Sequence, residues 1–320
     1  MAKDVHPILA MAAILVIAQL AALALAPAFA ATTGPVFEDT TDPLNSLIYI
    51  LLILVFTGLI LLVVRLRRQN VMKYVILGSM FFTMLLVFYL PFYLLFWSFL
   101  GSTSNWSWAD PLATLEGVVI SAALTYALAK YPEWYLVDAV GLSVAAGVTA
   151  ILGISFAILP ALVLLIGLAV YDAISVYKTK HMVTLADAAA TQRLPIMIVI
   201  PRTRRYSFLR QKSLKEQLAS GEEREAMFMG LGDVIIPGIL VVSSFMYLAN
   251  RANSVLGIAG NLIVALLTIA GTLVGFAVLM RFVMKGNPQA GLPLLNSGAI
   301  LGYALAYLVV YRDLTFGMLG

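Results

Sequence analysis

The chain has 320 residues, of which 62% are hydrophobic and 11% charged, with a mean hydropathy of +0.98. A soluble domain is about 45–50% apolar and about 25% charged, so this composition excludes an ordinary soluble protein and indicates a polytopic membrane protein. There is no cysteine, which excludes disulfides, thiolate nucleophiles and Cys-ligated metals. The two histidines, His6 and His181, are far apart in the chain, so we expect no metal site and no cofactor.

Nine apolar stretches reach or approach the roughly 20 residues that cross a bilayer as a helix. Helices are expected because backbone polar groups in lipid must be satisfied internally. The spans cover roughly 8–29, 46–64, 73–99, 111–129, 134–154, 157–177, 226–248, 254–280 and 290–311. The predicted fold class is all-α, a single membrane domain over 1–320. It has spans one to six in 8–177, a cytoplasmic loop at 178–225, and spans seven to nine in 226–320.

The first span has a competing interpretation. Lys3, an apolar run and the sequence Ala28-Phe29-Ala30 are similar to a secretory signal peptide with an Ala-x-Ala cleavage site. The run is longer than the usual signal core of about 7–15 residues, which favours a retained helix. Cleavage would leave eight spans and would not move the features discussed below.

Orientation follows from the distribution of Lys and Arg. With the N-terminus in the cytoplasm, 18 of the 20 basic residues lie on the cytoplasmic side, and only Arg251 and Arg312 lie outside. Cytoplasmic enrichment of Lys and Arg is the positive-inside signal. The sequence therefore predicts a cytoplasmic N-terminus and an external C-terminus for a multi-pass protein, which we place in the cell membrane of a prokaryote.

The polar stretch 178–225 contains one apolar island, Leu194 to Pro201, which is rich in β-branched residues. It is too short to span a membrane and indicates a short strand or interfacial segment. The following stretch, from Arg202 to Arg224, is strongly basic and is expected to be surface helix or loop that contacts lipid headgroups. No base-reading or stacking elements accompany these charges, so we expect no nucleic-acid partner.

Two acids, Asp172 and Asp233, lie within apolar spans six and seven. An intramembrane acid is costly and is by default a candidate functional residue. Counted at about 1.5 Å per residue from the ends of their spans, both lie about 9–12 Å below the cytoplasmic boundary. Because the two spans are consecutive and antiparallel, the carboxyls can face each other. Two such acids predict acid/base chemistry inside the membrane.

The residues around Asp233 indicate irregular backbone. Gly230 and Gly232 permit close approach, and Pro237 cannot donate a hydrogen bond to the carbonyl of residue 233. Two other membrane acids, Glu116 and Asp138, are expected to be structural, with Asp138 near enough to the cytoplasmic end of its span to reach the interface. Tyr171 is expected to support the site, whereas Tyr177 resembles an interfacial anchor.

The motifs Tyr171-Asp172 and Gly230-Leu231-Gly232-Asp233 resemble the YD and GLGD pair of the presenilin and signal peptide peptidase superfamily, most closely its archaeal presenilin homologues. The third motif of that family, Pro-Ala-Leu, is degraded here to Gln289-Ala290-Gly291-Leu292-Pro293, in which only Leu292 is identical. The predicted orientation is similar to presenilin, whereas the GLGD window is similar to signal peptide peptidase, so both branches remain open.

This resemblance implies an intramembrane aspartyl protease that hydrolyses transmembrane substrates with a water activated by Asp172 and Asp233. Two close carboxyls share one proton, because both cannot ionise cheaply. The implied substrate-binding residues are Gly230, Leu231, Gly232, Ala290, Gly291, Leu292 and Pro293, with Tyr171 and Pro237 in support. We also expect an unwound substrate to add as a strand to 194–200 or near Leu292. A change of Ile198 to Pro should then depress cleavage.

The rival interpretation is a proton- or cation-coupled transporter or a leak channel, since paired intramembrane acids and broken helices also occur there. The two halves show no convincing internal repeat, which disfavours it. Expected partners are transmembrane peptides or proteins and membrane lipids. A homo-oligomer is compatible with the sequence, and no obligatory partner subunit is expected.

Overall fold

The structure is a computed structural model of the whole chain. It describes residues 2–66, 69–100, 108–179, 187, 189–203, 206–210, 225–250, 257–285 and 289–318. The first six helices are α1 (Ala2–Thr32), α2 (Leu44–Arg65), α3 (Gln69–Leu100), α4 (Ala109–Lys130), α5 (Trp134–Ser155) and α6 (Ile158–Ala173). A π-helical turn, η1 (Ile174–Lys178), follows α6 directly, and then come β1 (Met197–Pro201), the 3-10 turn η2 (Phe208–Arg210) and β2 (Ala226–Gly230). The last helices are α9 (Leu231–Tyr247), α10 (Gly260–Val283) and α11 (Gly291–Tyr311).

Within the described residues, eight helices are long and apolar enough to cross a membrane. They correspond to eight of the nine predicted spans. The remaining apolar helix, α9, has 17 residues and is shorter than these eight when α6 is counted together with the π-helical turn that continues it, as Ile158–Lys178. The chain is therefore a helical, multi-pass membrane protein, and the class predicted from composition is confirmed.

One span boundary predicted from hydropathy is wrong. The span predicted at 226–248 begins with a strand, because Ala226–Gly230 pairs with Met197–Pro201, and its helix starts only at Leu231. Hydropathy cannot separate these states, since a buried strand and a buried helix are both apolar. For the span predicted at 254–280, residues 254–256 lie outside the described residues, and α10 runs from Gly260 to Val283. The basic stretch predicted as surface helix or loop lies largely outside the described residues, in 211–224.

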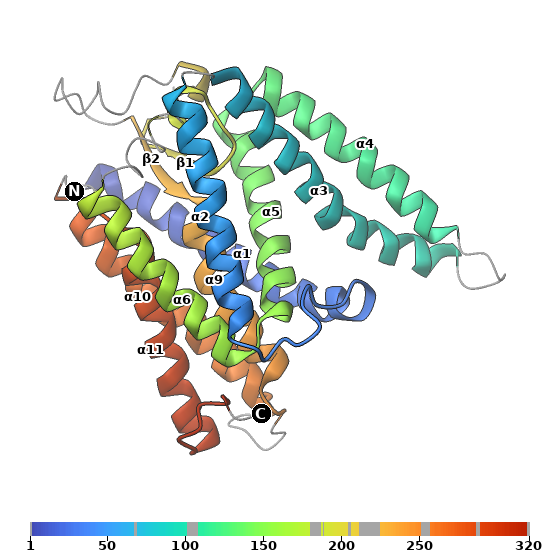
Figure 1. Cartoon of the computed structure of the whole chain (residues 1–320), viewed down its shortest axis with the longest axis vertical. Helices are drawn as coiled ribbons and strands as arrows, with labels where there is room; N and C mark the ends of the chain where they lie inside the picture. The colour runs from blue at the N-terminus through green and yellow to red at the C-terminus, as the bar shows by residue number, and fades with distance from the viewer. Residues whose placement is uncertain are drawn as a thin grey trace.

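The helices form a bundle in which α1, α5 and α9 pack on one another at the centre (Figure 1). The α3–α4 pair lies on one side of this centre, and α6, α10 and α11 lie on the other. Helix α2 is peripheral and packs on α6 and α3. The first helix, which the sequence left open as a signal peptide, buries Met11, Leu15 and Phe29 inside this bundle.

The closest helix contact joins α10 to α11 through four glycines. Gly271 and Gly275 of α10 face Gly298 and Gly302 of α11, and a Cβ built on Gly298 would lie 2.3 Å from the Gly271 carbonyl oxygen. Small residues four apart allow backbones to approach in membranes, where packing rather than hydrophobicity drives helix association. This contact fixes α11, whose first turn reaches the functional site.

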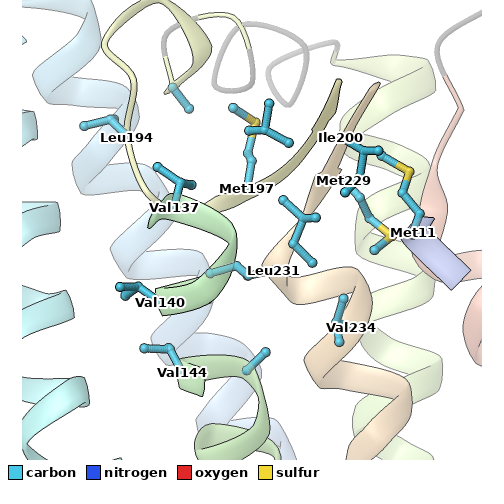
Figure 2. Close-up of a cluster of buried hydrophobic side chains, with 14 of the residues drawn as sticks. Met11, Val137, Val140, Val144, Leu194, Met197, Ile200, Met229, Leu231 and Val234 are labelled. Atoms are coloured by element: carbon cyan, nitrogen blue, oxygen red, sulfur yellow. The ribbon is translucent and has the colours of Figure 1, made fainter. Parts of the chain in front are cut away.

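The short strand predicted at 194–201 is confirmed as β1, but its partner β2 was missed. The two strands are antiparallel, with Ile198 opposite Met229 and Val199 opposite Phe228. Their apolar side chains join the main core, where Met197, Ile200 and Met229 pack near Leu231 and Val234 of α9 (Figure 2). The hairpin therefore closes one end of the bundle, and β2 leads directly into α9.

Candidate active site

Asp172 lies in the last turn of α6, immediately before the π-helical turn Ile174–Lys178. Its side chain is only 5% exposed, and its Oδ2 accepts the backbone N–H of Leu292 at 3.1 Å. Single π-turns in helices occur frequently at functional sites. The acid is thus buried, and the start of α11 supplies a backbone donor to it.

Asp233 lies in the first turn of α9, not in mid-helix as the predicted span implied. Gly230 is the N-cap residue in an extended conformation, which makes Asp233 the third residue of the helix. Its carboxyl reaches back toward this N-cap residue, since Oδ2 lies 3.6 Å from a Cβ built on Gly230, which is the direction an acid takes at this position in a capping box. The helix N-terminus also favours negative charge. The Gly-x-Gly-Asp spacing therefore places an acid at a strand-to-helix junction.

The turn before α11 brings the two acids together. Leu292 donates its N–H to Asp172, and a Cβ built on the neighbouring Gly291 would lie 2.8 Å from Oδ1 of Asp233. Both carboxyls therefore converge on two consecutive residues, and the charge of Asp172 acts on Asp233. The sequence predicted that the two carboxyls could face each other, and this turn is where they meet, although the residue count used for their depth assumed a helix where β2 lies.

Tyr177 holds the same turn from the side of α6. Its hydroxyl donates to Oε1 of Gln289 at 2.8 Å and accepts the N–H of Ala290 at 3.4 Å. The sequence suggested only an interfacial anchor for this tyrosine. Its contact with residues more than 100 positions away could not be read from a local pattern.

A cavity of about 320 Å³ opens beside Asp233. Its lining combines β2, the end of α10 and the turn before α11, and it is rich in methionine. The lining residues are Met11, Arg202, Ala226, Met227, Phe228, Met229, Asp233, Leu279, Met280, Val283, Met284, Gln289 and Gly291. Methionine is flexible and polarisable, so such a wall can adapt to different apolar side chains. The cavity is large enough for several side chains of an extended peptide.

The residues expected at the site divide between the cavity and the core. Gly232 is exposed, with open space around its Cα, and Gly291 lines the cavity. Leu231, by contrast, is 7% exposed and packs against Gly141 of α5, so its side chain points into the core. Pro237 is buried inside an α9 that stays helical.

Three other residues expected near the site lie around its margins. Tyr171 is half-buried on α6, next to Asp172, and Pro293 is half-buried in the first turn of α11. Ala290, the residue before α11, is 1% exposed. Of the residues predicted at the site, only Gly232 is exposed.

The two acids expected to be structural behave differently. Glu116 is half-buried on α4, away from the hairpin. Asp138 is 8% exposed, and its Oδ1 accepts the Val199 N–H at 2.7 Å, so the side chain is bound within the protein. The strand that binds it lies 61 residues away, so hydropathy alone could not reveal this partner.

Chemically, the site consists of two carboxyls, from α6 and α9, that converge on the turn before α11 beside a cavity rich in methionine. One carboxyl can hold a proton while the other accepts one from water, since like charges at close range do not both ionise cheaply. That arrangement is suited to general acid/base hydrolysis of an uncharged bond.

A protein-family model described as signal-peptide peptidase, presenilin aspartyl protease matches residues 12–311. The chain is also similar to two solved structures, both described as a presenilin family intramembrane aspartate protease, in C222 and P2 space groups. Each is 36% identical; the TM-scores are 0.65 and 0.63, with 95% of this chain and 99% and 98% of the other chains covered. No curated protein sequence matches the chain. None of these similarities supports a transporter.

Proposed function

The chain belongs to the signal-peptide peptidase and presenilin family and is an intramembrane aspartate protease, and we propose that Asp172 and Asp233 are its catalytic pair. The observation that carries this assignment is the shared turn. Asp172 accepts the Leu292 N–H at 3.1 Å, while Asp233 lies against Gly291, the adjacent residue. A water or peptide carbonyl at this turn would be in reach of both carboxyls.

In the proposed reaction the pair holds one proton. The ionised carboxyl takes a proton from water as its oxygen attacks the peptide carbonyl carbon, and the protonated carboxyl donates to the carbonyl oxygen. Collapse of the tetrahedral intermediate breaks the C–N bond, and a proton passes to the leaving nitrogen. The products are a carboxylic acid and an amine, and water is the only co-reactant.

The substrates are transmembrane segments, which must unwind before their backbone can reach the acids. The expectation that they pair with 194–200 needs revision, because β1 is already paired with β2 and the Val199 N–H on its other edge is held by Asp138. Within the part of the chain that the structure describes, the unpaired edge of this sheet belongs to β2. Phe228 lies opposite Val199 and lines the cavity that contains Asp233, which supports addition of a substrate strand along β2.

The strand-addition step is tested at Phe228. A proline there removes the outward N–H without touching the ladder to β1, since proline is tolerated on edge strands. Phe228→Leu is the matched control, because it changes the side chain but keeps the N–H. We expect Phe228→Pro to cleave at least ~10-fold more slowly than Phe228→Leu, as an ordered backbone contact is lost. Equal rates in the two variants would exclude pairing at this edge. The earlier test, Ile198→Pro, would instead break the β1–β2 ladder.

The catalytic pair is tested with Asp172→Asn and Asp233→Asn. The purified protein in detergent is given a fluorescently labelled transmembrane peptide, and products are separated by mass. Each variant should lose about 10²–10⁴-fold in cleavage rate, the typical contribution of acid/base catalysis. Glu116→Gln, an acid on α4 away from the turn, is the control and should cleave normally. Wild-type rates in either Asp variant would refute the assignment.

We further propose nine crossings in one membrane domain, with α9 as a short seventh crossing, a cytoplasmic N-terminus and an external C-terminus. The 18 to 2 partition of Lys and Arg supports this orientation, and a prokaryotic cell membrane is its proposed location. Because the chain has no cysteine, a single cysteine placed at Asp313 or at Ser207 reports the sidedness of each. An impermeant maleimide on intact cells should label the first and not the second.

A further inference from the structure

Asp138 is a buried acid that catalysis by the two site aspartates does not require. It lies one turn into α5 and is 8% exposed, and its Oδ1 accepts the backbone N–H of Val199 at 2.7 Å. A buried carboxylate is retained at a cost unless it is hydrogen-bonded. Here the bond joins a transmembrane helix to a strand of the hairpin, which suggests a role in placing that strand.

The bond closes the outer edge of β1. In an antiparallel pair successive residues point their N–H groups alternately toward and away from the partner strand. Leu231 donates to Ile196 O and Arg202 donates to Glu225 O, so the even-numbered residues of this segment face β2. Val199 therefore faces away from β2, and Asp138 satisfies the N–H that a further strand would otherwise use.

The same face of α5 also locates the start of α9. Gly141 lies one turn after Asp138, and a Cβ built there would lie 3.1 Å from the Leu231 side chain. In Figure 2 Leu231 lies beside α5, whose Val137, Val140 and Val144 belong to the same buried cluster as Leu231. Since Leu231 is two residues from Asp233, a shift of the hairpin against α5 moves the acid.

A second carboxylate on α5 holds the other end of this segment. Glu133 accepts the Ser207 hydroxyl at 2.6 Å and the Phe208 N–H at 3.1 Å. Phe208 is fully buried and packs on Phe228 of β2, with ring centroids 6.2 Å apart. The start of α5 thus anchors both the β1 edge and the segment that supports β2.

We propose that Asp138 is a positioning residue for proteolysis. By binding the Val199 N–H it fixes the hairpin against α5, so that, among the described strands, the free edge is that of β2, offered in one register relative to Asp233. A short carboxyl side chain is suited to this role because it offers an acceptor oxygen to the N–H in either protonation state. The proposal rests on the proposed catalytic pair and predicts control of where a substrate is cut as well as how fast.

Three substitutions test it. Asp138→Leu removes the acceptor, Asp138→Glu moves the carboxylate outward by one methylene, and Asp138→Asn retains an oxygen in the original place. Purified variants cleave the labelled transmembrane peptide, and mass spectrometry gives every cleavage position. Thermal unfolding in detergent shows which variants are folded, and Glu116→Leu on α4 controls for removing a membrane acid.

We expect Asp138→Leu and Asp138→Glu to shift or broaden the cleavage positions and to lower kcat/KM about 10–100-fold, as ångström-scale misplacement does. Asp138→Asn should keep the wild-type positions. A purely structural role would lower thermal stability without moving the cleavage positions. If Asp138→Leu does not fold, Asp138→Glu decides alone, and wild-type positions in it overturn the proposal. If Asp172→Asn or Asp233→Asn cleaves normally, the catalytic assignment itself has failed, which is a separate result.

Discussion

The close contact between α10 and α11 gives a quantitative prediction for Gly298→Ala. The added Cβ would lie 2.3 Å from the Gly271 carbonyl oxygen, whereas ordinary contact begins at 3.4 Å. Because the obstructing atom is backbone, a side-chain rotation cannot relieve the clash, and the helices must separate by about 1 Å. Overpacking of this kind costs roughly 1–3 kcal/mol of stability.

The same displacement reaches the site, because α11 carries Leu292 in its first turn. A shift of about 1 Å would lengthen the 3.1 Å bond from Leu292 N to Asp172 Oδ2 beyond hydrogen-bonding range. Misplacement on this scale can cost about 10²-fold in rate. We therefore expect Gly298→Ala to lose about 10²-fold in cleavage at temperatures where it is still folded.

The assay compares cleavage of the labelled transmembrane peptide with thermal unfolding of the same detergent preparation. Gly58→Ala is the matched control, since nothing lies within 4 Å of a Cβ built at that position on α2. It should retain both rate and melting temperature. If Gly298→Ala also retains both, the close helix approach does not position the turn and the reasoning is refuted. A lower melting temperature with a normal rate would separate packing from catalysis.

Three further predictions concern single side chains. Gly232→Ala adds a methyl where no atom lies within 4 Å, so it should keep or slightly raise the melting temperature. It should raise KM, because the methyl fills space that substrate is expected to use. An unchanged KM would show that substrate does not use this space. Tyr177→Phe removes the 2.8 Å hydrogen bond to Gln289. It should lower the free energy of unfolding by about 0.5–1.5 kcal/mol and the cleavage rate several-fold. An unchanged rate would show that this bond does not position the turn before α11. Burial, and then the charge of Glu225, raise the pKa of Tyr206, so the folded state holds its proton more tightly. The stabilisation that this raised pKa gives the folded state is fully present below about pH 10 and is lost as pH rises further. Tyr206→Phe should therefore reduce the fall in melting temperature that thermal unfolding shows at alkaline pH.

The membrane class and both acids were predictable from the sequence alone. Eight of the nine hydrophobic spans appear as long helices, because the length needed to cross a bilayer and the need to satisfy backbone polar groups leave few alternatives. Asp172 and Asp233 stood out because charge in an apolar span is expensive. Their motifs were enough to indicate the family, which the comparisons confirm.

The β-hairpin was only half predictable. The β-branched run at 194–201 indicated a strand, but Ala226–Gly230 continues an apolar stretch into α9 and resembles the start of a span. Whether an apolar segment becomes strand or helix depends on its partner, and that partner lies about 30 residues away.

What the tertiary structure alone decided is which side chains meet. The turn at Gly291 and Leu292 joins the two acids, Tyr177 binds Gln289, and Asp138 binds the Val199 N–H. Each of these contacts spans more than 55 residues, so no local pattern encodes it. The residues for acid/base chemistry are written in the sequence, because their cost in lipid marks them. Their geometry comes from helix packing and backbone hydrogen bonds, which exist only once the chain has folded.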